Sequence, residues 1–457
     1  MMKKVNRRSF QKTAVAASTA VPLFSIGKPG PSANSRLNVA VIGTGNVAWR
    51  AFEGTQNENL VAICDVDSRM FAQHAKRFSA MEKAATFADF RVMLDKLGGE
   101  IDMVCISTPD HTHFPATLGA MERGIHTFTQ KPLTHNVWQA RTLKKAKAHY
   151  KVLTNMGNQG HTSNGIRQLK EWYDLGIFGQ ITEVHSYRDG PKWNGNYFQR
   201  PETLPPATDA VPATLDWDLW QGPTGPAPFN KLYHPKKWRG FNRYGGGMFG
   251  DWFCHIADAP VWLLDLYEPV CIEAESVEGG NEWMVADGCR VRFDFERRAD
   301  KAPCTVYWYN GDPKRFSPAL PEDWGWGSLP AAGTFFHGTK NNGFTDERSN
   351  NPRLSSRDAA IAFKNAGYPA ETIPRIEGGP VLELVNAIKG GPEPGSNFDY
   401  AAPFTEIMLL GILAVNHGGR IEWDSRNMRI TNRPELNQYL KEPVRKGWEY
   451  GEELWKS

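Results

Sequence analysis

The sequence lacks the features that mark several classes of protein. Its 53 lysine and arginine residues nearly balance its 50 aspartate and glutamate residues, so the net charge is only +3, and no basic stripe indicates a nucleic-acid surface. No uninterrupted apolar run reaches the ~18 residues of a membrane-spanning helix. The longest run after the N-terminus, EIMLLGILAV at 406–415, predicts a buried core helix. We therefore expect neither a nucleic-acid partner nor a membrane anchor in the mature protein.

Cysteine is also scarce. The six cysteines form no CxxC pair, so the sequence predicts no zinc or iron–sulfur centre and no other metal site. Cys64 and Cys105 lie in apolar, strand-like segments and are expected to be packed thiols. Cys271, Cys289 and Cys304 are expected on neighbouring strands, where one disulfide is a minor alternative in an oxidising compartment.

The N-terminus resembles an export signal. RRSFQK at 7–12 fits the twin-arginine pattern. An alanine-rich apolar run at 13–26 has the length of a signal core, and GKPGPSANS at 27–35 interrupts any regular structure. We predict that residues 1–35 are a twin-arginine signal peptide and linker and that the protein is exported to the periplasm. The alternative is a disordered basic tail, and no A-x-A motif marks a cleavage site.

Residues 36–160 alternate apolar strands with amphipathic segments. Strands are expected at 37–43, 60–66, 102–108, 125–130 and 151–156, and helices at 70–80, 113–124 and 136–150. This alternation predicts an α/β domain with a parallel, doubly wound sheet, the Rossmann architecture.

Residues 161–457 show a different pattern of predicted elements. Longer strands are expected at 181–188, 270–278, 288–296 and 304–311. They predict an α+β domain with an open-faced, largely antiparallel sheet. Segments 189–240 and 311–375 are rich in proline, glycine, asparagine and tryptophan and are expected to be long loops, which are usually functional or cover an interface.

A dinucleotide-binding motif follows the first strand. GTGNVA at 43–48 is a GxGxxA sequence in which Gly43 permits a tight turn and Gly45 lets the backbone approach a pyrophosphate. Asp65 ends the second strand about 20 residues further on, where a carboxylate binds the ribose hydroxyls and repels a 2′-phosphate. The sequence thus predicts NAD rather than NADP as the cofactor.

Two further motifs carry a family resemblance. ISTPDHTHFPATLGAMERGIHTFTQKPLTHN at 106–136 and DWFCH at 251–255 resemble the Gfo/Idh/MocA oxidoreductases, as do NFDYAAPFTEIMLLGILA and IEWDSRNMRITN near the C-terminus. The resemblance covers nearly the whole chain from Leu37 and is closest to exported bacterial members. The family's Glu-Lys-Pro signature reads Gln130-Lys131-Pro132 here, so an amide replaces the usual carboxylate.

Oxidation of a secondary alcohol needs a hydride acceptor and a base. Asp251 and His255 are four residues apart, so on a helix they share a face. There the carboxylate would fix the imidazole tautomer and raise its basicity. We therefore predict His255 as the general base. The resemblance implies that Lys131 holds the substrate hydroxyl and stabilises the developing oxyanion, and Gln130 leaves the ionisation state of Lys131 open.

The remaining candidates are expected around this centre. The resemblance places the cofactor against Gly43, Thr44, Gly45, Asn46, Val47, Asp65, Ser107, Thr108, Pro109, His113, Gln130 and Lys131. Aromatic rings stack on sugar faces and Arg, Asn and His bind hydroxyls. A carbohydrate or polyol is therefore expected on Asn158, Gln159, His161, Tyr187, Arg188, Trp238 and Arg239, each of which also suits a structural role.

Three functions stay open at this point. The first is an NAD-dependent sugar, glycoside or polyol dehydrogenase. The second is a redox-neutral enzyme that keeps its NAD, oxidises one hydroxyl and returns the hydride to the same molecule or to a second sugar. In one version it is a glycosidase that eliminates the glycosidic group beside the transient ketone, adds water and then reduces the ketone. The third is a non-catalytic NAD- or sugar-binding protein. The twin-arginine route carries folded proteins, so export favours tightly retained NAD. The resemblance also implies a homo-oligomer formed through the C-terminal sheet.

Overall fold

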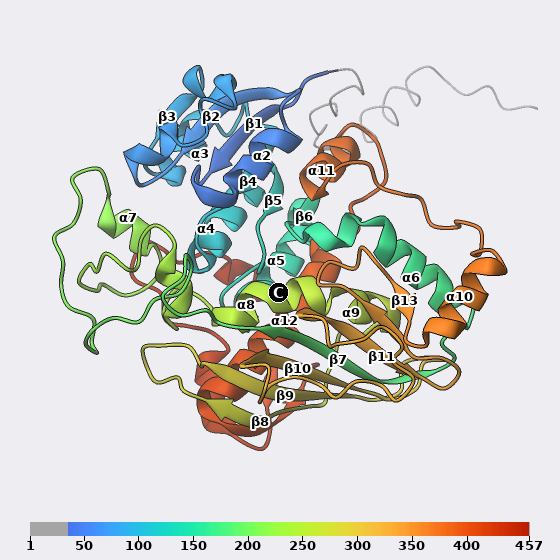
Figure 1. Ribbon diagram of the computed structural model, residues 1–457. Helices are drawn as coiled ribbons and strands as arrows, with labels where there is room; N and C mark the ends of the chain where they lie inside the picture. Colours follow the sequence, from blue (N-terminus) through green and yellow to red (C-terminus); the bar gives the residue numbers. More distant parts are fainter. Residues whose placement is uncertain (1–34, 457) are drawn as a thin grey trace, which may run out of the picture.

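A computed structural model of the chain describes residues 35–456. The predicted export signal therefore lies almost entirely outside the described residues. Two sheets organise the described part (Figure 1), and three helices lie between them. These helices are α8 (Gly247–Ile256), α9 (Asp258–Leu264) and α12 (Phe398–His417).

The six-stranded sheet is parallel throughout, in the order β3-β2-β1-β4-β5-β6. Its strands are β1 (Asn38–Ile42), β2 (Asn59–Cys64), β3 (Ala85–Phe87), β4 (Met103–Ile106), β5 (His126–Thr129) and β6 (Thr154–Met156). Its helices are α2 (Trp49–Gly54), α3 (Phe90–Leu97), α4 (Asp110–Met121) and α5 (Val137–Tyr150). Every residue of β4 is buried, as helices on both faces require. The predicted Rossmann architecture is confirmed.

The prediction of a helix at 70–80 is wrong. That stretch begins in a short 3₁₀ helix, Ser68–Ala72, and continues as turns. Its backbone is tied to a distant part of the chain, since the Ser68 amide donates to the Thr214 carbonyl at 3.0 Å. Tertiary contacts thus override the local helical pattern.

The nine-stranded sheet is mixed, in the order β13-β12-β11-β7-β10-β9-β8-β14-β15. Its strands are β7 (Ile181–Asp189), β8 (Cys271–Glu278), β9 (Gly288–Phe295), β10 (Cys304–Gly311), β11 (Ala332–Gly338), β12 (Gly343–Thr345), β13 (Arg353–Leu354), β14 (Gly419–Asp424) and β15 (Arg429–Ile430). Only β7 and β10 pair in parallel. Buried and half-buried residues alternate along β9, so one face is covered and the other is open. The predicted α+β domain is confirmed.

The predicted loop at 311–375 contains more regular structure than expected. It holds β11, β12 and β13 together with α10 (Arg357–Asn365). The strands are short and rich in glycine, and they form because β11 pairs with β7 along its length. The predicted loop at 189–240 contains only α7 (Trp217–Gln221) and a 3₁₀ turn, Lys237–Gly240.

Within the described residues, one helix is long and apolar enough to cross a membrane by length and composition alone. It is α12, and 78% of its apolar window is buried inside the protein. Burial of this extent is expected of a core helix and agrees with the buried core helix predicted at 406–415. All six cysteines lie in the described part, buried and free, so the alternative of a disulfide is not realised.

The C-terminal part of the chain also supports the first sheet. Val381 and Leu384 of α11 (Pro380–Ile388) pack into the apolar core beside β1. Trp448 lies against Phe90 of α3, with ring centroids 6.0 Å apart. The remaining helix, α6 (Asn164–Asp174), precedes β7. The predicted division after residue 160 therefore separates the two sheets, although later segments complete the first core.

Candidate active site

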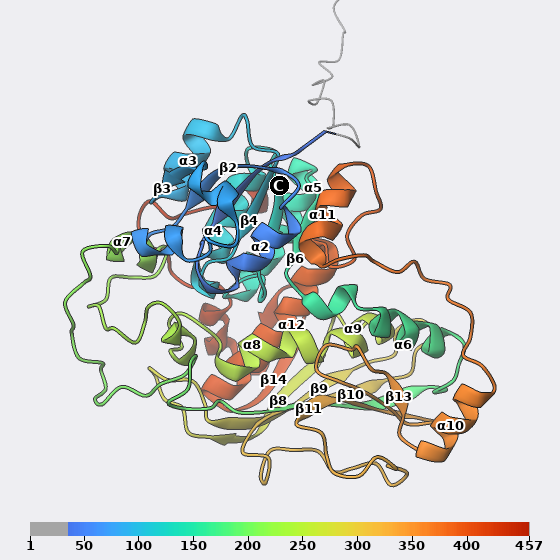
Figure 2. The ribbon, with the colours of Figure 1, turned by 45° about the horizontal axis from the view of Figure 1, so that its top comes forward.

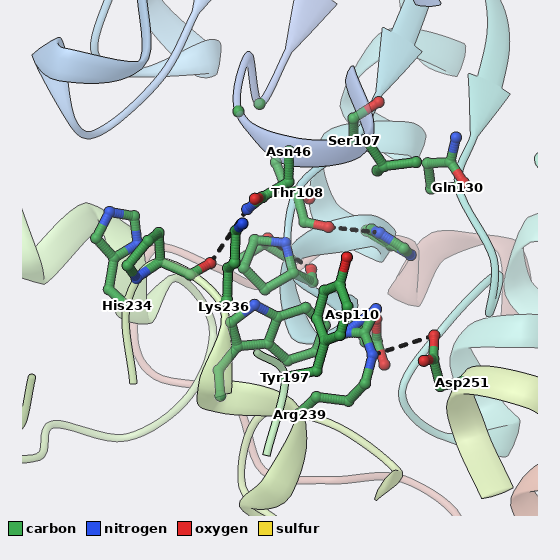
Figure 3. Close-up of a pocket in the computed structure, with 18 of the residues that line it drawn as sticks. Asn46, Ser107, Thr108, Asp110, Gln130, Tyr197, His234, Lys236, Arg239 and Asp251 are labelled. Atoms are coloured by element: carbon green, nitrogen blue, oxygen red, sulfur yellow. Dashed lines mark hydrogen bonds and ion pairs between the residues drawn. The ribbon is translucent and has the colours of Figure 1, made fainter. Parts of the chain in front are cut away.

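A cavity of about 790 Å³ lies at the carboxyl ends of the parallel strands. It extends from Gly45 and Asp65 to Asp251 and His255, and its position is the usual ligand site of doubly wound sheets. The opposite wall comes mostly from residues 190–246, which we call the covering segment, and from α8. Figure 3 shows Asn46, Ser107 and Thr108 on one side, and Tyr197, His234, Lys236 and Arg239 on the other.

The glycine motif forms a tight turn at one end of the cavity. Gly43 has φ +79°, and a Cβ there would lie 2.8 Å from the backbone of Ser107, so a side chain is excluded. The Thr44 amide donates to the Asp65 carboxylate at 2.8 Å. Burial raises the pKa of Asp65 to about 6, although amides of Thr44 and Asp67 donate to it. Asp65 thus carries negative charge at neutral pH and fixes the turn.

Several polar atoms in the cavity wall are left without partners. Ser107 Oγ, Thr108 Oγ1 and Gln130 Nε2 are buried and have no hydrogen-bond partner among the described residues. Buried polar groups in native proteins are nearly always hydrogen-bonded. A nicotinamide dinucleotide offers carbonyl, amide and hydroxyl partners, so these residues and the glycine turn fit NAD.

His113 connects the two strand ends that carry these residues. Its Nδ1 lies 2.7 Å from the Pro132 carbonyl, and its Nε2 lies 2.9 Å from the Thr108 carbonyl. Burial lowers the pKa of His113, and a neutral ring donates from only one of its nitrogens. His113 therefore lines the cavity as a brace between the end of β4 and the Lys131-Pro132 turn.

Lys131 and Asp251 form a partly buried ion pair at the other end of the cavity. Lys131 Nζ lies 2.5 Å from Asp251 Oδ1, and Arg239 Nε lies 3.1 Å from the same oxygen. Burial alone would raise the pKa of Asp251, but Arg239 and Lys131 outweigh it and hold that pKa well below its usual range. Asp251 is therefore a permanent carboxylate that positions Lys131.

The predicted pairing of Asp251 with His255 is not what the structure shows. His255 Nδ1 lies 3.0 Å from Asn158 Oδ1, and Asn158 Nδ2 donates to the Cys254 carbonyl at 2.6 Å. A carbonyl can only accept, so the amide orientation is fixed and Nδ1 of His255 must donate. The proton on Nδ1 leaves Nε2 as the basic nitrogen. Asp251 pairs with Lys131 and Arg239 rather than with His255. Asn158 orients the imidazole in its place.

The same surroundings keep His255 neutral. Burial holds its pKa well below 6.5, and the positive charges of Lys131 and Arg348 lower it further. Asp251 opposes this effect but is outweighed. At neutral pH the imidazole is thus able to accept a proton.

The other candidates for substrate binding divide into two groups. Gln159, Arg188, Trp238 and Arg239 line the cavity. Asn158, His161 and Tyr187 lie outside its wall. His161 Nδ1 lies 2.9 Å from Asp258 Oδ1 in a buried network, and the Tyr187 ring stacks on Phe335 with centroids 5.7 Å apart. Of the cofactor candidates, only Thr44 lies behind the wall, where it holds Asp65.

The structure adds wall residues that the sequence analysis did not single out. Trp252 lies inside the DWFCH motif, and its position beside Asp251 could have indicated it. The guanidinium carbon of Arg188 lies 3.4 Å from the Trp252 ring centroid, and that of Arg348 lies 5.3 Å from it. Arg348 comes from the expected loop at 311–375 and has no local signal. Asp110 begins α4, lines the cavity, and has a pKa raised by burial.

The covering segment is bonded to the Rossmann domain at the Asp65 end of the cavity. His234 Nε2 lies 2.9 Å from Asp67 Oδ2, and Asn46 Nδ2 donates to the Pro235 carbonyl at 3.4 Å. The Asp216 amide donates to the Val66 carbonyl at 2.9 Å. In Figures 1 and 2 this segment, which contains α7, extends beside the six-stranded domain. These hydrogen bonds hold the covering segment against the Asp65 end of the cavity.

Two family models match the chain. Residues 37–158 match the NAD-binding Rossmann fold of the Gfo/Idh/MocA oxidoreductase family, and residues 162–304 match the C-terminal alpha/beta domain of the same family. The chain belongs to the Gfo/Idh/MocA family. NAD is accordingly its cofactor, and the resemblance of the sequence motifs is confirmed.

Curated members of this family align with about a third of the chain. D-glucoside 3-dehydrogenase of Escherichia coli is 31% identical over 153 residues, 32% of this chain and 42% of the relative. Inositol 2-dehydrogenase of Rhodococcus jostii is 27% identical over 165 residues, 35% of this chain and 44% of the relative. The matched stretches thus span less than half the length of these relatives.

Solved structures share the fold over most of the chain. The WlbA dehydrogenase from Chromobacterium violaceum, in complex with NADH and UDP-GlcNAcA, has a TM-score of 0.60 at 16% identity and covers 88% of this chain and 99% of its own. A levoglucosan dehydrogenase in complex with NADH and L-sorbose has a TM-score of 0.57 at 16% identity, with coverage of 85% and 99%. At this identity the likeness establishes the Gfo/Idh/MocA fold alone.

Proposed function

We propose that this Gfo/Idh/MocA protein oxidises a secondary hydroxyl of a sugar, glycoside or polyol, keeps the NADH that results tightly bound, and returns the hydride to a second sugar, which regenerates NAD before the next turnover. One observation carries the proposal: a single cavity joins the dinucleotide turn to a lysine, a carboxylate and a neutral histidine. A non-catalytic NAD- or sugar-binding protein would have no use for that constellation.

The residues of this chain divide the chemistry between them. When bound, NAD supplies the hydride acceptor. Lys131, held by Asp251, donates to the substrate oxygen and stabilises the negative charge that develops on it. His255 accepts the hydroxyl proton at Nε2, and Asn158 keeps its ring in the required tautomer. The Arg188 guanidinium stacks on the Trp252 ring in the same wall, where it can donate to sugar hydroxyls.

The residues that line the cavity indicate the class of substrate, and the names of related proteins support it. Arg188 and Gln159 present hydrogen-bonding groups beside the Trp252 ring, surroundings that suit a polyhydroxylated ligand. The names of the aligned proteins include a glucoside dehydrogenase and inositol dehydrogenases.

Retention of NAD is supported by the covering segment and by the N-terminal motif. The bonds of His234 and Pro235 to the Rossmann domain enclose the Asp65 end of the cavity. A twin-arginine signal at residues 1–35 would carry the protein, already folded around NAD, to the periplasm. An enclosed cofactor suits that route, because a dissociating one would be lost after export.

A redox-neutral glycosidase is the second candidate, and Asp110 is the observation that favours it. Elimination beside a ketone needs an acid or base in addition to the one that moves the hydroxyl proton. Asp110 faces the same cavity, and burial raises its pKa, which favours the protonated acid.

The first experiment measures cofactor occupancy. The protein is purified without added NAD and denatured, and the NAD(H) released is quantified per chain. Near-stoichiometric release supports retention, whereas an empty site contradicts it. Occupied protein is then incubated with sugars and glycosides in deuterated water. A keto product with matching NADH indicates the dehydrogenase. Free sugar with deuterium beside the oxidised carbon indicates the glycosidase, and no turnover contradicts both.

We also propose that the open face of the nine-stranded sheet joins copies of this chain. Arg290 and Arg292 alternate with buried residues along β9 and pair with Glu275 and Glu273 of β8. A face of mixed charges can complement itself in a second copy. Light scattering on the purified protein is expected to give a multiple of the chain mass, and a monomeric mass contradicts this proposal.

A further inference from the structure

We propose that Glu183, His185 and His337 bind a divalent cation of the zinc class. The three residues lie on the open face of the nine-stranded sheet, apart from the cavity described above. One ligand atom from each residue lies within 4.8 Å of the others. Two imidazoles and one carboxylate form a donor set that zinc commonly occupies in proteins.

Strand register brings these residues together. Glu183 and His185 are two apart on β7, so they share a face. In the antiparallel pair of β7 with β11, His337 lies directly opposite Glu183, and Phe335 lies opposite His185. The imidazole rings of His185 and His337 have centroids 5.1 Å apart. Figure 1 shows the two strands side by side in the nine-stranded sheet.

Two hydrogen-bonding observations indicate a ligand at this cluster. Nε2 of His337 is buried and has no hydrogen-bond partner among the described residues, which is unusual for a buried polar atom. Nδ1 of His185 lies 2.9 Å from the Tyr309 hydroxyl, and its Nε2 lies 2.7 Å from Glu183 Oε1. Tyr309 thus orients His185 through the ring nitrogen that faces away from the cluster, as partners of metal-bound histidines do.

The surrounding charges and the freedom of Glu183 allow a cation to enter. The neighbouring Arg290 is paired with Glu275 at 2.7 Å, so its charge is compensated. Donor atoms around tetrahedral zinc are about 3.4 Å apart when each bond is about 2.1 Å. The Glu183 carboxylate must therefore move off His185, and its side chain is 45% exposed and free to turn. Water would complete the coordination.

The cluster is separated from the active site by the sheet itself. Alternate residues of β7 face the helices: Ser186 Oγ lies 3.0 Å from Thr334 Oγ1, which donates to the Ile256 carbonyl of α8 at 2.9 Å. Glu183 and His185 point to the other side. We therefore infer a site that joins β7 to β11 and takes no direct part in hydride transfer.

The test uses the whole, untagged protein. It is stripped of metal with a chelator, dialysed and titrated with Co²⁺, and tetrahedral coordination is followed by its intense visible absorption. Zn²⁺ stoichiometry is measured in parallel by mass spectrometry of bound metal. We expect about one equivalent per chain, and Zn²⁺ should displace Co²⁺. Absence of a saturable Co²⁺ signal overturns the proposal.

Variants locate the site. His337→Gln and Glu183→Gln are expected to abolish that equivalent, whereas the exposed His149→Gln serves as the matched control and should retain it. Tyr309→Phe is expected to weaken binding by roughly 10–100-fold, as loss of an orienting partner does. Circular dichroism and NAD content report on folding. Undiminished metal binding in folded His337→Gln and Glu183→Gln proteins contradicts the assignment.

Discussion

The two walls of the cavity are built in different ways. The Rossmann wall uses short turns that directly follow buried parallel strands: the glycine turn after β1, Asp65 after β2, Ser107 and Thr108 after β4, and Lys131 after β5. The opposite wall comes mostly from the covering segment, 57 residues (190–246) with little regular structure, and from Arg348 in a distant loop.

The two walls therefore differ in how firmly they hold the residues that face the cavity. The Rossmann wall holds each group at the end of a rigid strand, which is where cofactor and catalytic groups need precise support. The covering segment is bonded to that wall by only a few hydrogen bonds. We infer that the Rossmann wall, together with Asp251 and His255 of α8, determines the reaction, and that the covering segment determines how long the cofactor stays.

The largest expected effect comes from Lys131→Ala and His255→Ala. Turnover of NAD-loaded protein should fall by about 10²–10⁴-fold, because a positioned base and an oxyanion donor each contribute on that order. Lys192→Ala is the matched control, since Lys192 lines the same cavity but is 79% exposed. Wild-type turnover in either alanine variant with NAD bound would refute the assigned roles.

Asp65→Asn addresses the Rossmann wall at its cofactor end. The Thr44 and Asp67 amides donate to different oxygens of Asp65, so the asparagine amide keeps only one of these hydrogen bonds. It also no longer repels a 2′-phosphate. NADP binding relative to NAD should improve by roughly tenfold, since a like-charge contact of this kind costs on the order of 1–4 kcal/mol. Competition of the two nucleotides in a fluorescence titration measures the ratio. An unchanged ratio would place the adenine ribose elsewhere.

His234→Ala tests the hydrogen bond between His234 of the covering segment and Asp67 of the Rossmann wall. It leaves Asp67 with Arg69 but removes the contact to the covering segment. Release of NAD should accelerate by roughly tenfold, in line with a hydrogen bond to a charged group of about 1.5–3 kcal/mol. Dissociation is measured by trapping released NAD with a second enzyme. If His234→Ala and the control His149→Ala release NAD equally slowly, the segment does not retain the cofactor.

The pH dependence of kcat/KM tests the surroundings of His255. Its folded pKa is depressed below 6.5, so the base stays unprotonated as the pH falls to 6.5, and activity is lost only at lower pH, when the imidazole gains a proton. Asn158→Asp places a carboxylate on Nδ1 and should move this acid limb to higher pH. Gln159→Glu adds the same charge next to it in the sequence. An equal shift in both variants would argue against a specific Asn158–His255 contact.

Gln130→Glu is expected to have the smallest effect. The added carboxylate lies beside Lys131 and favours cationic forms of the groups around it, so the pH optimum should shift while NAD remains bound. Asp251 already pairs with Lys131, which limits the change. Loss of NAD from this variant would contradict this expectation and would show that cofactor binding depends on the Gln130 amide as a hydrogen-bond donor.

Residues near the ends of strands were predictable because their signals are local. The glycine turn, Asp65 and the Lys131 position each follow an apolar strand, and parallel strands bring their carboxyl ends to one edge. The partner of His255 was not predictable in this way. Helix spacing correctly places Asp251 and His255 on one turn, but Arg239 and Lys131 compete for the carboxylate, and Asn158 arrives from another element.

The sequence alone determined the Rossmann order, the choice of NAD and the family, because these depend on periodicity and on motifs within a few tens of residues. Only the tertiary structure decided which residues lie opposite the Rossmann wall and which gather on the open face of the nine-stranded sheet. The covering segment, Arg348, and the Glu183, His185 and His337 cluster join residues far apart in the chain. Their proximity follows from strand register and from loop docking, and neither is encoded in local spacing.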